Sequence, residues 1–351
     1  MQFTLRVPSR LATLASLILS ATLAACGGDG DNASPTVPET AFTDTKLVSD
    51  IAGAPNTDPN LINAWGIAFN PTGFVWVTNT GSSTSTLYDG NGLRQTLVVK
   101  TPAAPIGIVF NGSKSDFKGS PFIFSTAAGA IAAWSPEVDL NNAATVFNGA
   151  ASGNSYRGLA IASYNGATYI YATDFANDRV DVFDAKFAKA AMPGGFRDPN
   201  LPAGYGPYGI QAIGDRIYVS YAKHAGRFEE RTPGAGVLNV FDTSGNLVKR
   251  LVTGGTLNAP WGIAIAPANF GTYSGKLLVG NFGDGTVQAY DPNTGAAAGL
   301  LHKADGTNII IDGLWGLAFG NGVNSQPANT LYYTAGPSAG AHGAYGRIDM
   351  K

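Results

Sequence analysis

Six copies of one short pattern decide the fold: a residue that is often aromatic, then glycine, then isoleucine or leucine, at the start of an apolar run. The copies are Trp65-Gly66-Ile67, Ile106-Gly107-Ile108, Arg157-Gly158-Leu159, Tyr208-Gly209-Ile210, Trp261-Gly262-Ile263 and Trp315-Gly316-Leu317. Their glycines follow one another at intervals of 41, 51, 51, 53 and 54 residues. A repeat of about fifty residues indicates a radial or stacked array of similar units rather than one conventional domain.

Each copy continues with a second apolar strand, a turn, and a third strand that ends in an aromatic residue and often an acid. In the third copy, residues 170–174 (IYATD) lead to residues 180–184 (VDVFD). Short strands of this composition, separated by Gly, Asn and Asp turns, are typical of an antiparallel sheet. So small a sheet must pack against copies of itself, and radial closure leaves only short edges. The sequence therefore predicts an all-β fold, a six-bladed β-propeller.

The two ends of the repeat region indicate how the ring closes. A strand-like segment, residues 42–49, precedes the first copy, whereas the last copy ends with Ile348 and Asp349. We therefore expect the N-terminal strand to complete the last blade, so that the propeller occupies residues 42–351. No stretch after residue 30 shows helical periodicity with caps.

The N-terminal segment predicts export. Arg6 and Arg10 precede an apolar run, residues 11–25, that is too short for a comfortable membrane span. The run ends in Leu-Ala-Ala-Cys-Gly at residues 23–27, which resembles a bacterial lipoprotein signal with Cys26 as the lipidated residue. Cys26 is the only cysteine in the sequence, so no disulfide competes for it. A plain secretory signal with a chance cysteine is the alternative.

This resemblance implies a signal peptide at residues 1–25 and a lipid anchor in the membrane. Because Gly27 rather than Asp follows the cysteine, it also implies delivery to the bacterial outer membrane. Residues 26–41, rich in Gly, Asp, Ser and Pro, are predicted to form a flexible tether. Charged residues make up only 13% of the chain, the net charge is -2, and no basic cluster occurs, so the sequence offers no electrostatic footprint for nucleic acid.

The repeats resemble NHL-type propellers over about residues 42–351. Residues 260–264 (PWGIA) and 174–184 (DFANDRVDVFD) match the two parts of that pattern, whereas other copies are degenerate. The whole chain also resembles an uncharacterised group of bacterial exported and lipoprotein propellers. Both resemblances imply an architecture and no particular reaction.

The mouth of the central channel is where this architecture brings loops of several blades together. The loops that enter the inner strands supply the predicted binding residues Asn63, Tyr156, Arg157 and Asn258. Arg157 stands where its counterparts are apolar, so it either contacts an anion or forms a local salt bridge. The recurring tryptophans either form an aromatic cage or, as we favour, pack between blades.

Oxygen-bearing side chains at the same face predict a Ca²⁺ or Mg²⁺ site, formed by Asn79, Asp174, Asn281 and Asp312. Six-bladed lactonases of the gluconolactonase type use such an ion to polarise an ester. Their pattern includes a glutamate on an inner strand, and none of the six glycine motifs carries one. Ordinary turn formation by Asn and Asp is the alternative.

Two histidines in long Gly-rich loops, His224 and His342, are the candidate general acid and base, or the histidine of a streptogramin-lyase-like propeller. A solvated histidine is the alternative for each. The densely charged loop 227–231 either docks a partner or is solvated.

Two functions follow from these patterns. The first, which we favour because no catalytic constellation is complete, is a noncatalytic module of the cell envelope that binds a small molecule, a glycan or a protein. The second is a metal-dependent hydrolase or lyase that acts at the channel mouth.

Overall fold

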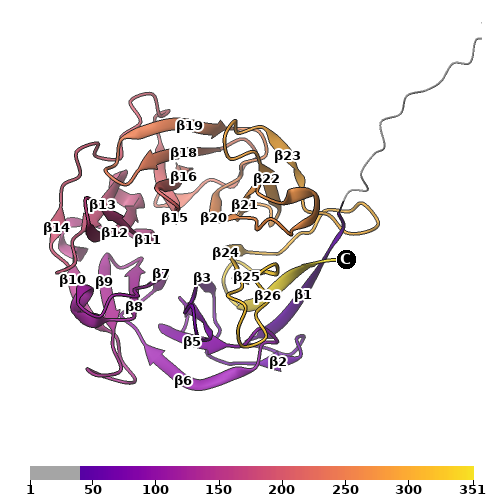
Figure 1. Cartoon of the computed structure of the whole chain (residues 1–351), viewed down its shortest axis with the longest axis horizontal. Helices are drawn as coiled ribbons and strands as arrows, with labels where there is room; N and C mark the ends of the chain where they lie inside the picture. The colour runs from indigo at the N-terminus through magenta and orange to yellow at the C-terminus, as the bar shows by residue number, and fades with distance from the viewer. Residues whose placement is uncertain (1–39) are drawn as a thin grey trace, which may run out of the picture. The chain divides into compact units, whose positions relative to one another are not determined.

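The computed structural model describes residues 40–351, so Cys26 and the predicted signal peptide lie outside the described residues, as does the predicted tether up to residue 39. Six sheets, antiparallel apart from one short parallel strand pair at an outer edge, surround one axis (Figure 1), which confirms the six-bladed β-propeller. The inner strands contact one another in chain order, and β24 contacts β3 to close the ring. No helix in the described part of the chain is long and apolar enough to cross a membrane.

From the axis outward, the strands are as follows. Blade 1 has β3 (Ala64–Phe69), β4 (Val75–Asn79), β5 (Thr84–Tyr88) and β6 (Arg94–Lys100). Blade 2 has β7 (Pro105–Phe110), β8 (Phe122–Thr126), β9 (Ala130–Trp134) and β10 (Ala144–Asn148). Blade 3 has β11 (Tyr156–Tyr164), β12 (Ala167–Asp174), β13 (Arg179–Phe183) and β14 (Lys189–Ala190).

The second half of the ring repeats this order. Blade 4 has β15 (Tyr205–Ile213), β16 (Arg216–Ala225), β18 (Gly236–Asp242) and β19 (Leu247–Thr253), with β17 (Phe228–Glu229) paired to β16. Blade 5 has β20 (Pro260–Ile265), β21 (Leu277–Asn281), β22 (Val287–Tyr290) and β23 (Ala297–Leu300). Blade 6 has β24 (Leu314–Phe319), β25 (Leu331–Ala335), β26 (Ala344–Met350), β1 (Phe42–Ser49) and β2 (Asn56–Thr57). Within residues 40–351 the helical turns are the short 3-10 segments η1 (Asp116–Gly119), η2 (Ala150–Ser152), η3 (Phe175–Asn177) and η4 (Gly271–Tyr273).

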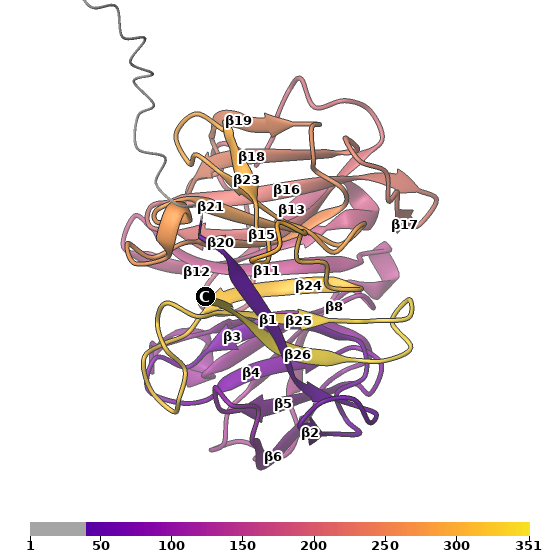
Figure 2. The same ribbon diagram turned by 90° about the vertical axis from the view of Figure 1, so that its right-hand side faces the viewer.

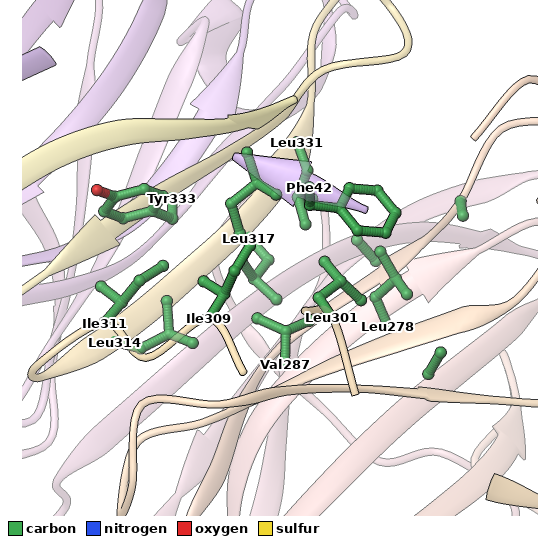
Figure 3. Packing of buried hydrophobic residues seen from close by; sticks show 14 of the residues in the cluster. Phe42, Leu278, Val287, Leu301, Ile309, Ile311, Leu314, Leu317, Leu331 and Tyr333 are labelled. Atoms are coloured by element: carbon green, nitrogen blue, oxygen red, sulfur yellow. The ribbon is translucent and has the colours of Figure 1, made fainter. Parts of the chain in front are cut away.

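The N-terminal strand completes the last blade, as predicted. β1 runs antiparallel to β26, with Phe42 opposite Met350 and Ser49 opposite Ala344 (Figure 2). Phe42 is 1% exposed and lies in an apolar cluster between blades 5 and 6, with Leu278 and Leu317 (Figure 3). Burying such an aromatic side chain contributes roughly 1.5–3 kcal/mol to stability, so β1 fastens blade 6 by packing as well as by hydrogen bonds.

The glycine of every repeat lies where two blades approach closely. A Cβ atom on Gly209 would lie 2.1 Å from the carbonyl oxygen of Trp261, and one on Gly66 would lie 2.3 Å from that of Ile106. The other four glycine positions of the pattern leave only 2.5 to 3.1 Å to a main-chain atom of the next blade. Any side chain there would force the inner strands apart, which is the physical reason for the repeated glycine.

In four of the six blades, a side-chain hydroxyl on the second strand joins this glycine to the following blade. In blade 3, Thr173 Oγ1 accepts a hydrogen bond from the Gly158 N–H at 2.7 Å and donates to the Tyr208 carbonyl at 2.7 Å. Thr78, Ser220 and Thr334 make the same two-sided connection in blades 1, 4 and 6. In blade 2, Ser125 accepts from Gly107, whereas blade 5 has Gly280 at this position.

These hydroxyl bridges make a first prediction. Thr173→Val keeps the side-chain shape but leaves a buried N–H and a buried C=O unpaired, so it should lower the free energy of unfolding by about 1–3 kcal/mol for each group. Thr173→Ser, the matched control, keeps the hydroxyl and should lie close to the wild type. Equilibrium urea denaturation measures both variants, and a valine variant as stable as the serine variant would contradict the role of the hydroxyl.

Candidate functional site

The first residue of each repeat pattern reaches one mouth of the channel, where several of them pack as an aromatic plug. Trp65 and Trp315 stack with ring centroids 3.4 Å apart, and Phe282 stacks on the other face of Trp315 at 3.6 Å. The Arg231 guanidinium lies 4.1 Å above the Phe282 ring, which is cation-π geometry. Trp261 lies edge-on to Trp65 and Trp315. The tryptophans therefore pack at the axis among rings of several blades, which agrees with the packing role that we favoured from the sequence.

Two cavities adjoin this plug on the same face. The central cavity, about 230 Å³, is lined by the plug together with Asn63, Arg157 and the Gly336–Gly340 turn. The lateral cavity, about 720 Å³, is lined by Phe175, His224 and loop residues near them. Both cavities share Ala127, Arg157 and Phe228, so these side chains form their common boundary.

Arg157 is the charged group at that boundary, and it is only 8% exposed. Its Nη1 donates a hydrogen bond to Ser155 Oγ at 2.7 Å, and its guanidinium lies 5.7 Å from the centroid of the Phe175 ring. Arg157 forms no ion pair within residues 40–351. The structure therefore does not contain the local salt bridge that was one of the two interpretations of Arg157 from the sequence. Arg157 is thus a buried cation without a carboxylate partner at a cavity wall.

The charged loop 227–231 forms part of the mouth, where it lines both cavities, although Arg227, Phe228 and Arg231 remain exposed to solvent. β17 pairs with the end of β16, with Phe228 opposite Ala225 and Glu229 opposite His224. The Glu229 side chain is 7% exposed and pairs with Arg231 at 3.4 Å, whereas Phe228 is 56% exposed. Burial raises the pKa of the nearby Tyr208 hydroxyl well above its ordinary value, and the charge of Glu229 raises it further, so Tyr208 stays neutral.

The two candidate catalytic histidines lie in different surroundings. His224 lines the lateral cavity, where its Nε2 is 2.7 Å from Asp178 Oδ1 and its ring packs on Phe175. His342 pairs through Nδ1 with Asp50 Oδ2 at 2.9 Å and lines neither cavity. The structure therefore brings only His224 to the mouth.

The side chains of the four predicted metal ligands make local hydrogen bonds and line neither cavity. Asp174 Oδ1 accepts from the Ser155 N–H at 2.9 Å, and Asn281 Oδ1 accepts from the Asn258 N–H at 3.0 Å, which is the same contact in another blade.

The remaining contacts of these ligands are also local. Asp174 Oδ2 accepts from Asn177 and pairs with Arg179, Asn79 donates to two threonines, and Asp312 accepts from the Ser338 N–H. No group of three His, Cys, Asp or Glu side chains suited to a metal occurs in residues 40–351. These contacts do not fit a shared ligand set, and the metal site stays a prediction from the sequence.

Of the four predicted binding residues, Asn63 and Arg157 line the central cavity. Tyr156 is fully buried between blades 2 and 3, where its hydroxyl donates to Asp181 at 2.8 Å. Asn258 is 2% exposed and donates to Asp284 at 3.0 Å. Both are structural contacts away from the cavities.

Further cavity residues, not identified from the sequence, come directly after the second strands of the blades. Thr80, Ala127, Phe282 and Gly336 occupy this place in blades 1, 2, 5 and 6, and all line the central cavity. Phe175 occupies it in blade 3 and lines the lateral cavity. Their constant offset from the strand end is the sequence signal that identifies them.

Comparison with known proteins adds relatives at the level of sequence. The uncharacterized protein R648 of Acanthamoeba polyphaga mimivirus is 33% identical over 344 residues, which cover 90% of this chain and 82% of that protein. The chain belongs to the same family. Uncharacterized protein L690 of the same virus is 34% identical, over 76% of this chain and 75% of that protein. No family model matches the chain. These viral relatives give no support to membership of a bacterial lipoprotein family.

Solved structures show the same fold at low sequence identity. Virginiamycin B lyase from Staphylococcus aureus superposes with a TM-score of 0.53 at 14% identity, over 89% of this chain and all of that one. The PQQ-bound aldose sugar dehydrogenase from Streptomyces coelicolor gives 0.53 at 16% identity, over 88% of this chain and 98% of that one. A Bacteroides thetaiotaomicron protein of unknown function gives 0.58 at 11% identity, over 89% of this chain and 77% of that one. At these identities the likeness extends to the fold alone.

Proposed function

We propose that this propeller is a binding module whose channel mouth takes a small organic carboxylate, with Arg157 as the counterion. The observation that carries this proposal is the buried guanidinium without an ion-pair partner at the wall shared by two cavities. Removing a charge from water is unfavourable unless a partner compensates it, and one hydroxyl with one ring offers little compensation. A carboxylate can accept two parallel hydrogen bonds from a guanidinium, which suits the unfilled donors of Arg157.

The surroundings of Arg157 define the rest of the ligand. The aromatic plug and the exposed ring of Phe228 provide apolar walls, whereas Arg231 is already paired with Glu229. Binding sites for small molecules combine mostly apolar walls with a few polar groups that orient the ligand. A compact acid with an apolar ring therefore fits better than a long polyanion.

A matched pair of probes tests this function. Benzoate and benzamide differ in charge but hardly in shape, and isothermal titration calorimetry measures their binding. We expect benzoate to bind at least tenfold more tightly than benzamide, because hydrogen bonds to charged groups contribute about 1.5–3 kcal/mol. Arg157→Gln should abolish this preference. Arg197→Gln removes the same charge from an exposed site and should preserve it. Equal binding of benzoate to wild type and Arg157→Gln would refute the proposal.

A second candidate function is acid-base catalysis in the lateral cavity. His224 lies on its wall, and the neighbouring Asp178 carboxylate is placed to orient and stabilise a protonated imidazole. A variant of virginiamycin B lyase with one histidine replaced by alanine is catalytically inactive, which is a statement about that protein. The metal-dependent hydrolase or lyase predicted from the sequence is the form of this candidate that also requires Ca²⁺ or Mg²⁺.

Turnover of a panel of lactones and p-nitrophenyl esters tests this candidate. Catalysis by His224 predicts a rate that falls about 10²–10⁴-fold in His224→Gln, the usual contribution of a general acid or base. His342→Gln is the matched control and should keep the wild-type rate. Loss of the rate with EDTA and recovery with Ca²⁺ would identify the metal-dependent form. A wild type no faster than His224→Gln on every substrate would exclude both forms for these esters.

We also propose that Cys26 carries a lipid that anchors the protein to the cell envelope, at the outer membrane of a bacterial host. The sequence of residues 23–27 supports this proposal. The first strand, β1, begins at Phe42, which lies opposite Met350 and on the same face as Phe319, the end of β24. The mouth lies on the other face, where β24 begins at Leu314. The first strand of the described chain therefore begins on the face of the propeller opposite the cavities.

Metabolic labelling tests the anchor. In Escherichia coli fed an alkyne analogue of palmitate, the full chain should become labelled and sediment with the outer membrane. Cys26→Ser should remove both the label and the sedimentation, because the thiol is the site of acylation. An unlabelled wild-type protein released by signal cleavage would show a plain secretory signal instead.

A further inference from the structure

A second set of unpartnered donors lies on the wall of the central cavity, on blades 6 and 1. Trp315 is 3% exposed, and its Nε1–H has no hydrogen-bond partner among residues 40–351. The other two tryptophans at the mouth are satisfied: Trp65 donates to Asn63 Oδ1 at 2.9 Å, and Trp261 donates to the Arg157 carbonyl at 3.1 Å. An indole N–H is a donor only, so Trp315 lacks an acceptor.

Asn63 supplies a donor beside it. Its Oδ1 must face the Trp65 N–H, because a nitrogen in that place could not accept the hydrogen bond. This fixes the amide orientation and leaves Nδ2, which donates no hydrogen bond within the described part of the chain. Asn63 has a φ of 52°, a left-handed conformation that asparagine tolerates better than most residues.

Both donors face the same turn, which has glycines where side chains would cover them. A Cβ on Gly336 would lie 3.2 Å from Trp315 Nε1, and one on Gly340 would lie 2.9 Å from Asn63 Nδ2. Trp315, Asn63, Gly336 and Gly340 all line the central cavity. The two donors therefore belong to the wall of the cavity that Arg157 also lines.

We infer that the ligand is a carboxylic acid with a second, uncharged oxygen acceptor, a carbonyl or a hydroxyl, which binds Trp315 Nε1 and Asn63 Nδ2. This inference rests on the proposed function, since the acid group is the one that binds Arg157. The charged side chains on the cavity wall are Arg157, Arg231 and Glu229, so their sum matches one carboxylate rather than two. The neutral donors of Trp315 and Asn63 match an uncharged oxygen.

Pairs of substituted benzoates test this assignment. The 3- and 4-acetylbenzoates carry a carbonyl, and the 3- and 4-isopropylbenzoates have nearly the same shape without an acceptor. We expect at least one acetylbenzoate to bind about tenfold more tightly than its isopropyl counterpart, which corresponds to about 1.4 kcal/mol. Trp315→Phe keeps a stacking ring but removes the N–H, so it should abolish this preference: each acetylbenzoate should then bind as tightly as its isopropyl counterpart.

A second variant perturbs the same donors without changing the tryptophan. A methyl group on Gly336 would lie 3.2 Å from Trp315 Nε1 and 2.2 Å from Asn63 Oδ1, so Asn63 must shift, and Gly336→Ala should also weaken the acetylbenzoates relative to their isopropyl counterparts. A melting curve close to that of the wild type shows that each variant is folded. If the wild type shows no acetyl preference, or if Trp315→Phe retains it, the second acceptor is overturned. Binding of benzoate would in that case leave the Arg157 site intact. Failure of benzoate itself to bind would instead overturn the proposed function, and this inference with it.

Discussion

The structure depends on the close approach of six inner strands, which glycine permits and which a bridging hydroxyl stabilises in four of the blades. At Gly209 the main chain comes so near to blade 5 that only a hydrogen atom fits on Cα, and Ser220 bonds the strands of both blades at once. Because this contact recurs around the ring, it fixes the position of the residue that precedes each glycine. The same repeated constraint that closes the propeller thus delivers one side chain of every blade to the channel mouth.

This arrangement explains why one substitution in the repeat has chemical consequences. Most blades place an apolar residue at that position, and the rings of three tryptophans with Phe282 fill the axis. In blade 3 the position holds Arg157, which is buried and whose guanidinium lies near Ser155 and the Phe175 ring. A cation in an aromatic wall, beside a cavity with unpartnered donors, is an arrangement that a ligand completes.

Much of the fold could be predicted because it rests on periodicity. The six glycine motifs indicated six blades, and segment 42–49 indicated the closing strand before its partner β26 was known. The hydroxyl bridges were missed because Thr173 and Tyr208 are far apart in sequence, and only the strand register shows that they meet.

The site was predicted in part, for a related reason. Asn63 and Arg157 were found because they belong to the loops and motifs that lead to the axis. Asp174 and Asn281 lie near the same face, but each turns to the N–H of a loop residue in its own blade, a contact that composition does not reveal. Glu229 reaches the wall of the central cavity through the β17 hairpin. This hairpin is not part of the repeat, so the repeat pattern could not predict the position of Glu229.

A crystal structure of residues 40–351 with 4-bromobenzoate tests the central claim most directly, because the anomalous signal of bromine locates the probe. Binding at the mouth predicts a bromine peak within the central cavity and the carboxylate within hydrogen-bond distance of the Arg157 guanidinium. The opposite face has an apolar funnel of about 420 Å³, lined by the C-terminal ends of the inner strands. A bromine peak there, with none near Arg157, would contradict the account.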